Sequence, residues 1–232
     1  MLDVSGSMYG NLALIRAAAG ELFARLGPND LGRVVLLGHE ITISARFTRS
    51  VPELLAILPR SIEPTAPTPL WRAMAEALRV LEEPSEERRV ILVLSDGKDD
   101  TGSPRSGPIG YTADFVIDRA RRNDVMIYAI GLYSRLSNRY VTPGSFTSAL
   151  NDDTPDPNLE RVAAESGGGY IEIRRGEDLA AAFTRVADEL HSQYLLGFTP
   201  PERDGKKHDI GVRVLKRGMQ PRARKSYVAP ER

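Results

Sequence analysis

The sequence predicts an α/β fold: a doubly wound, mainly parallel sheet with helices on both faces. Residues 90–94 and 125–132 are continuously apolar, which is typical of parallel strands buried on both faces. Amphipathic segments alternate with these apolar runs, as expected where helices cover such a sheet. The chain of 232 residues is long enough for one domain of this kind with an ordinary core, plus an appendage.

The other elements are predicted in chain order from the same patterns. Residues 32–47 favour two short strands around Gly38-His39-Glu40. An amphipathic run extends from Pro69 to Glu83, so Thr68 is predicted to be a helix N-cap with proline at the first helical position. Beyond the apolar strand at 125–132 we expect a helix at 159–166, a glycine turn at 167–169, a strand at 170–173 and a closing helix at 179–191.

The closing helix ends the predicted domain, and the composition changes from Glu202 onward. We therefore predict one domain over residues 1–192 and a basic β-ribbon extension over residues 193–232. Alternation at 208–216 predicts a strand, followed by a turn at 216–219. Cations far outnumber acids in the extension: Arg203, Lys206, Lys207, Arg213, Lys216, Arg217, Arg222, Arg224 and Lys225. The extension is predicted to have a solvated charged face or to dock onto an acidic partner.

The first residues of the chain carry a pattern suited to a metal ion. Asp3, Ser5 and Ser7 alternate, and their oxygens can converge on one hard cation if a strand runs into a turn here. Mg²⁺ takes oxygen ligands at roughly 2.0–2.1 Å in near-octahedral geometry and needs no His or Cys. The alternative is a serine-rich helix N-cap, with Asp3 near the positive end of the helix dipole.

Two later residues favour the metal interpretation. Asp96 follows the buried strand that begins near Arg89, and in open α/β sheets ligands bind at the carboxyl ends of strands. Thr68 lies at a predicted strand-to-helix junction, where its hydroxyl serves either as a cap or as a ligand. Thr65, three residues earlier, is an alternative to Thr68.

With these residues in order, the chain resembles the von Willebrand factor type A (VWA) family. The resemblance implies a metal-ion-dependent adhesion site formed by Asp3, Ser5, Ser7, Thr68 and Asp96, with Mg²⁺ as the ion and Mn²⁺ or Ca²⁺ as possible substitutes. It implies direct hydroxyl ligands, at least one acid acting through water, and an open position for the carboxylate of a protein partner. Residues 193–200 and 222–230 also resemble a bacterial VWA-related subfamily described from Acidobacteria.

The chain departs from the family pattern in two places. Only Met1 and Leu2 precede Asp3, where the family has a longer apolar strand, so we expect a truncated strand or another segment in its place. An upstream signal would be lost with such a strand, and a secreted or cell-envelope location is favoured in that case. Ala66-Pro67 stands before Thr68 where the family often has glycines.

Composition excludes several classes of function. The formal net charge is zero, so no global field attracts nucleic acid or an anionic membrane, and only Tyr227 offers stacking within the basic stretch. There is no cysteine, which removes disulfides and thiolate chemistry, and no apolar run reaches the roughly 18–20 residues of a membrane span. The sequence predicts no nucleic-acid partner and no direct membrane span.

Catalytic signatures are absent from the sequence as well. The chain has His39, His191 and His208, none beside a nucleophile motif, and it has no P-loop and no Gly-x-Ser-x-Gly. A Mg²⁺-dependent phosphotransferase with Asp3 as nucleophile is the enzymatic alternative, but it lacks an acid at position 5 and an evident lysine. We therefore predict no enzyme activity.

Two polar loops complete the predicted site edge. In the loop at 98–108, Asp99 and Asp100 either tune the ion, bind a second one or form a solvated turn; the loop at 134–158 is long enough to carry specificity. The resulting prediction is an adhesion-type module that engages an acidic group of a partner protein through a divalent cation. The alternative is a metal-independent assembly module of a larger envelope-associated protein.

Overall fold

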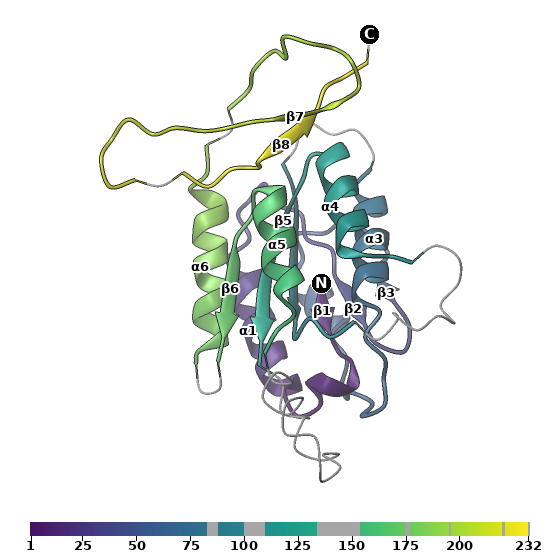
Figure 1. The fold of residues 1–232 in the computed structure, drawn as a ribbon. Coiled ribbons are helices and arrows are strands. Elements are labelled where there is room, and N and C mark those ends of the chain that lie inside the picture. Colours follow the sequence, from purple (N-terminus) through teal and green to yellow (C-terminus); the bar gives the residue numbers. More distant parts are fainter. Residues whose placement is uncertain are drawn as a thin grey trace, which may run out of the picture.

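A computed structural model describes residues 1–82, 88–99, 110–133, 154–174, 177–194, 196–219 and 221–231. Its centre is a six-stranded sheet in the order β3-β2-β1-β4-β5-β6 (Figure 1). The strands are β1 (Leu2–Asp3), β2 (Val35–Leu37), β3 (Thr42–Ile43), β4 (Arg89–Ser95), β5 (Val125–Leu132) and β6 (Tyr170–Ile173). All neighbours pair in parallel except β2 and β3, so the predicted mainly parallel sheet is confirmed.

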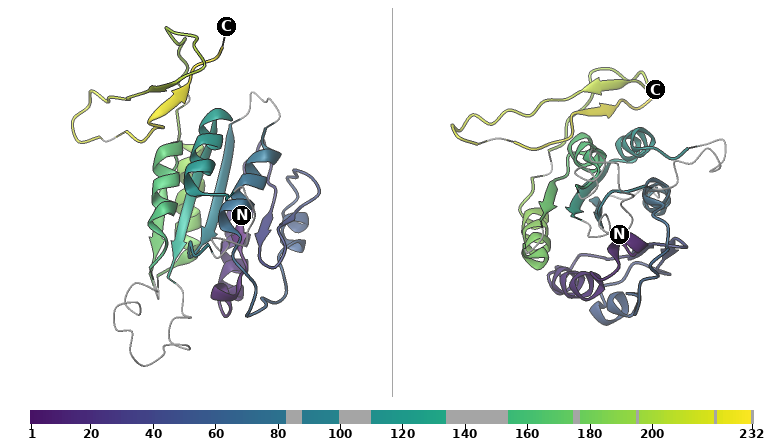
Figure 2. Two further views of the ribbon diagram at one scale, coloured as in Figure 1. Left: turned by 45° about the vertical axis from the view of Figure 1, so that its right-hand side comes forward. Right: turned by 60° about the horizontal axis from the view of Figure 1, so that its bottom comes forward.

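Helices cover both faces of the sheet, as Figure 2 shows. They are η1 (Gly6–Met8), α1 (Leu12–Ala24), α2 (Val51–Ala56), α3 (Leu70–Val80), α4 (Ala113–Arg122), α5 (Pro157–Ser166) and α6 (Leu179–His191). Side chains of α1, α2 and α6 share one hydrophobic core, and those of α3, α4 and α5 share another. The predicted doubly wound architecture is therefore confirmed.

Strand β5 shows why its sequence is apolar throughout. Tyr128 and Ile130 point into the core on the α1 and α6 side, whereas Ile127 and Ala129 point into the core on the α3 to α5 side. Successive side chains of a strand alternate between faces, so a strand covered on both faces needs apolar residues at every position. Full burial of one such side chain stabilises the fold by about 1.5–3 kcal/mol.

The predicted elements agree closely with the structure in the second half of the sheet and less closely around α3. Pro69, not Thr68, is the N-cap of α3, and Leu70 is its first residue, so the prediction of a Thr68 cap is wrong. Pro69 has φ −80° and ψ 57°, outside helical geometry, while its carbonyl accepts the amide of Ala73 at 2.8 Å. The hydroxyl of Thr68 is therefore not the cap of α3.

The first strand lies at the centre of the sheet although it contains two residues. Leu2 pairs with Leu36 of β2 on one side and with Leu94 of β4 on the other. The amino group of Met1 donates to the Leu92 carbonyl at 2.7 Å. These bonds fix the position of Asp3, which is the last residue of β1.

The C-terminal segment forms a separate two-stranded antiparallel sheet from β7 (Lys207–Asp209) and β8 (Ser226–Val228). It lies across the end of the domain from which the parallel strands start, opposite η1 (Figures 1 and 2). The ribbon is therefore confirmed, but the strand predicted at 208–216 is wrong in length, because its pairing ends at Asp209. No helix within the described ranges is long and apolar enough to cross a membrane.

Candidate metal centre

The turn after β1 gathers polar side chains beneath the protein surface. Asp3 and Ser5 are fully buried; the Asp3 Oδ1 accepts the Ser5 amide at 2.9 Å, and the Ser5 and Ser7 hydroxyls lie 3.0 Å apart. Ser5 precedes η1 but makes no side-chain capping bond, and α1 has Asn11 as its N-cap. The helix-capping alternative therefore does not explain these side chains.

The end of β4 adds a second carboxylate to this region. Asp96 is fully buried, its Oδ1 accepts the Lys98 amide at 3.2 Å, and its Oδ2 has no hydrogen-bond partner. A buried carboxylate oxygen without a partner is costly, because it has lost water and gained nothing in exchange. This orphaned oxygen is what a bound cation would satisfy.

Burial and the nearby Asp96 also change the pKa of Asp3. Burial and the negative charge of Asp96 raise the pKa of Asp3 to about 7, although hydrogen bonds from Ser5 and Ser95 act in the opposite direction. Two carboxylates that repel one another in a water-poor environment resist ionisation together. A divalent cation between such groups would reverse the repulsion.

Ser95 is a site residue that the sequence analysis missed. Its hydroxyl donates to the Asp3 Oδ2 at 2.5 Å and accepts the Gly97 amide at 2.9 Å. It therefore links the end of β4 to the end of β1 and fixes the orientation of the Asp3 carboxylate. Its position immediately before Asp96 at a strand end was the only available signal.

Gly6 brings the segment that carries Thr68 against the first turn. Its amide donates to the Ala66 carbonyl at 2.8 Å, and a Cβ at this position would lie 2.1 Å from the carbonyl oxygen of Pro64. Only glycine permits this approach without displacement of the loop. The glycine was not predicted to matter, because the contact joins segments about sixty residues apart in the chain.

Thr68 and its alternative lie in different environments. Thr68 is buried, with 4% of its surface exposed, two residues beyond the Ala66 carbonyl that binds Gly6. Thr65 is exposed, and its hydroxyl donates to Glu63 at 3.1 Å. This difference favours Thr68 over Thr65 as a ligand.

Other predicted candidates have different surroundings. The Asp99 carboxylate accepts the Trp71 amide at 3.4 Å near the start of α3. Asp100 and most of the loops predicted at 98–108 and 134–158 lie outside the described residues. His191 pairs with Asp30 at 2.8 Å and His208 with Asp204 at 2.9 Å, while His39 lies exposed in the turn between β2 and β3.

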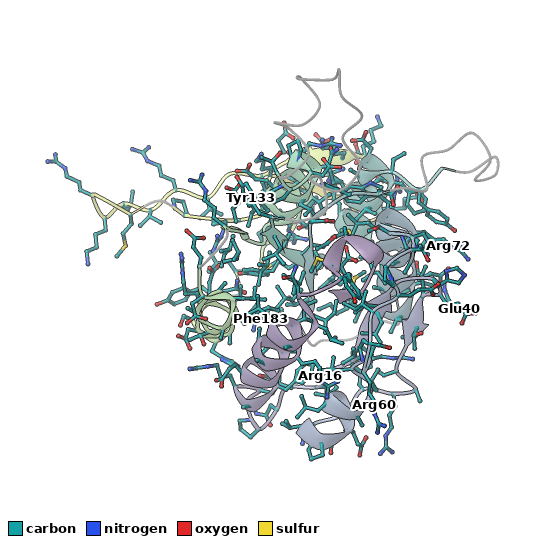
Figure 3. All side chains as sticks on the ribbon, turned by 90° about the horizontal axis from the view of Figure 1, so that it is seen from below. Arg16, Glu40, Arg60, Arg72, Tyr133 and Phe183 are labelled. Carbon is teal, nitrogen blue, oxygen red and sulfur yellow. The ribbon has the colours of Figure 1, made fainter. Side chains whose placement is uncertain are left out.

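The donor set fits a hard divalent cation. Hydroxyls of Ser5, Ser7 and Thr68 and carboxylates of Asp3 and Asp96 supply only oxygen, which is the chemistry that Mg²⁺ selects. Figure 3 views the molecule from this end, with α1 and α6 packed alongside one another.

Comparison with known proteins agrees with this fold. The family model for the von Willebrand factor type A domain matches residues 1–184. The chain belongs to this family. VWA domains are typically non-catalytic binding modules and often bind a divalent cation. A comparison with curated proteins finds no match.

Solved structures share the VWA fold at low sequence identity. A von Willebrand factor type A protein from Catenulispora acidiphila has 18% identity and a TM-score of 0.59, covering 80% of this chain and 40% of its own. The type V pili tip protein Mfa5 of Porphyromonas gingivalis, through its vWF domain, has 15% identity and a TM-score of 0.56, covering 86% and 96%. The pilus adhesin SpaC of Lactobacillus rhamnosus GG has 13% identity and a TM-score of 0.54, covering 82% and 30%. The present chain thus spans less than half the length of the Catenulispora and Lactobacillus proteins.

Proposed function

We propose that this VWA domain binds a carboxylate-bearing protein partner through a divalent cation, with Asp3, Ser5, Ser7, Thr68 and Asp96 around the ion. The observation that carries the proposal is the pair of buried acids. Asp96 has an unpartnered Oδ2, and burial together with the charge of Asp96 raises the pKa of Asp3 to about 7. Structural burial of two acids without a cation would be an unfavourable arrangement.

The residues have distinct parts in this proposal. Ser95 holds the Asp3 carboxylate through its short hydrogen bond, and the Lys98 amide holds one oxygen of Asp96. The hydroxyls of Ser5, Ser7 and Thr68 are neutral ligands and leave the net charge of the ion largely uncompensated. When bound, Mg²⁺ would supply an electrophilic position for an outside carboxylate. Mn²⁺ or Ca²⁺ are alternative occupants.

An adhesion-type role is consistent with relatives of the same fold. SpaC is described as a pilus adhesin and Mfa5 as a pili tip protein. A secreted or envelope location and membership in the bacterial subfamily described from Acidobacteria remain predictions from the sequence. The competing proposal is a metal-independent assembly module, and metal dependence separates the two.

The test is calorimetric titration of Mg²⁺ and Mn²⁺ into EDTA-treated wild type, Ser5→Ala and Asp96→Asn. Ser192→Ala is the matched control, because Ser192 lies after α6 and its hydroxyl bonds only to the Asp188 carbonyl among described groups. We expect saturable binding by wild type and the control, and loss of binding in the site variants. Circular dichroism establishes that each variant is folded. Absence of binding by folded wild type, or equal binding by all four proteins, would refute the metal site.

A further inference from the structure

The tip of the C-terminal ribbon, residues 211–219, is exposed along its whole length. It carries the large apolar side chains Val212, Val214, Leu215 and Met219, and Leu215 has 90% of its surface exposed. Exposed apolar residues that cluster in sequence on a protruding segment mark interaction surfaces more often than isolated ones. The tip extends beyond the domain body in Figures 1 and 2.

This segment has the pattern of a strand but lacks a strand partner. Apolar side chains occupy every second position from Ile210 to Val214, yet the ladder to β8 ends at Asp209. The last backbone bond runs from the Ile210 amide to the Lys225 carbonyl at 2.9 Å. Beyond it, residues 211–219 make no hydrogen bond or ion pair with another described residue. Their backbone groups are therefore open to pairing.

The base of the ribbon, in contrast, is fixed to the domain. Ser226 and Ala229 are buried, Lys225 pairs with Glu165 at 3.2 Å, and Arg224 forms an ion pair with Asp124. Tyr227 stacks on His208, with ring centroids 5.5 Å apart. The open strand is thus presented from an anchored support.

The alternation of side chains and the charges of this strand indicate which kind of partner segment would pair with it. Ile210, Val212 and Val214 continue the face of His208, because they lie at every second position. Arg213, Lys216 and Arg217 have no acidic partner among the described residues, unlike the cations at the base. A complementary strand would therefore offer apolar side chains at alternate positions and carboxylates between them.

We propose that residues 210–217 accept an extended acidic and apolar segment of another protein by strand addition. Backbone bonds to residues 211–215 would supply affinity, and contacts with Val212, Val214 and Arg213 would supply specificity. This surface lies at the end of the sheet opposite the proposed metal centre, so the inference does not depend on the proposed function.

Other occupants fit less well. Self-pairing of two copies would place cations of one tip near cations of the other, which is unfavourable across a strand pair. Insertion into an anionic bilayer would leave the backbone groups of residues 211–215 unpaired in lipid, whereas strand addition satisfies them.

The test is selection of the full chain against a phage-displayed library of random twelve-residue peptides in EDTA, which removes any metal-site contribution. We expect enrichment of peptides in which apolar residues alternate with Asp or Glu. Amide hydrogen exchange then locates the binding surface: the peptide of highest affinity should slow exchange of the backbone amides of residues 211–215. The double variant Gly211→Pro/Leu215→Pro should weaken its binding about tenfold or more. The Ile210 amide points toward β8, so the amides of residues 211, 213 and 215 face the open edge, and proline removes such donors.

Charge reversal provides the matched comparison. Arg213→Glu should lower the affinity for acidic peptides about threefold. Arg203→Glu makes the same charge change outside the open strand and should leave this affinity unchanged. An unchanged circular dichroism spectrum shows that each variant is folded, so a loss of affinity does not come from unfolding. The proposal is overturned by no enrichment, by enrichment of basic peptides, or by protection elsewhere. Binding to phosphatidylserine vesicles or dimerisation in ultracentrifugation, each without peptide protection of residues 211–215, would also overturn it.

Discussion

The two ends of the sheet differ in how their polar groups are placed: they are buried at one end and exposed at the other. At the carboxyl end, Asp3, Ser5 and Asp96 are fully buried, and hydrogen bonds from backbone amides hold the Asp3 and Asp96 carboxylates. At the amino end, the ribbon tip is exposed and its backbone groups pair with no other described residue. The first arrangement suits an ion of fixed size, and the second suits an extended chain that brings its own hydrogen bonds.

The difference shows where rigidity comes from in this fold. The buried end gains it from bonds between segments far apart in the chain, such as Ser95 to Asp3. The ribbon end gains it only at its base, where Ser226 and Ala229 are buried. Substitutions should therefore have large effects at the first end and small ones at the second.

Gly6→Ala should produce the largest effect. The added methyl group would lie 2.1 Å from the Pro64 carbonyl oxygen, so the loop before Thr68 must move. We expect a loss of about 3 kcal/mol in the free energy of unfolding, from steric strain and displaced backbone. Chemical denaturation measures this value. The control is Gly211→Ala, since a Cβ there meets nothing within 4 Å, and a similar loss in both variants would contradict the contrast between the ends.

Ser95→Ala should affect the metal centre more than the fold. The substitution removes the 2.5 Å bond that orients Asp3 and leaves the Gly97 amide without its acceptor. We expect Mg²⁺ affinity to fall about tenfold or more, as for other residues that hold a ligand in place. Calorimetric titration measures the affinity, and Ser95→Thr should retain much of it if its hydroxyl reaches Asp3. Unchanged affinity in Ser95→Ala would show that Asp3 needs no such support.

Metal binding should strengthen as pH rises through about 7. The pKa of Asp3 is raised to about 7, so below that value the free protein holds a proton that the cation must displace. Above it the carboxylate is already ionised, and the affinity should level off. Titrations at pH 6 and pH 8 in buffers with different ionisation enthalpies measure the protons released. We expect release approaching about one proton at pH 6 and little at pH 8.

Asp96→Asn separates this linkage from other titrating groups. Without the neighbouring negative charge, the pKa of Asp3 should move down toward its ordinary value. Nuclear magnetic resonance of the Asp3 carboxyl carbon in EDTA follows the change directly. A pKa that stays near 7 in Asp96→Asn would assign the shift to burial alone.

The sequence alone predicted those parts of the fold that depend on local patterns. The apolar run at 125–132 and the amphipathic run at 179–191 correspond to β5 and α6 at both ends. The Thr68 cap was wrong, because the backbone of Pro69 has non-helical angles that no local rule reveals. The strand at 208–216 was too long, since alternation indicates a strand but does not supply the partner it needs.

For the candidate site, too, the sequence predicted residues that belong to local patterns and missed those whose role depends on distant contacts. Asp3 and Ser5 were predicted from the alternating triplet at the start of the chain, and Asp96 from its position after a buried strand. All three are buried in the structure, and their role as metal ligands stays a prediction. Ser95 was missed because its importance depends on a bond to a residue 92 positions away. Gly6 was missed for the same reason, since its partner Ala66 belongs to another segment of the chain.

The smallest effect is expected at the base of the ribbon. Arg224→Ala removes an ion pair with Asp124, whose side chain is 63% exposed, and exposed pairs contribute about 1 kcal/mol or less. The free energy of unfolding should change within that limit, while amide exchange in β7 and β8 should become faster. Mg²⁺ affinity should not change, because the ribbon and the metal centre lie at opposite ends of the sheet. Reduced Mg²⁺ affinity in Arg224→Ala would instead show that the two ends are coupled through α5, β5 or α6. The metal centre and the ribbon would then not be independent surfaces.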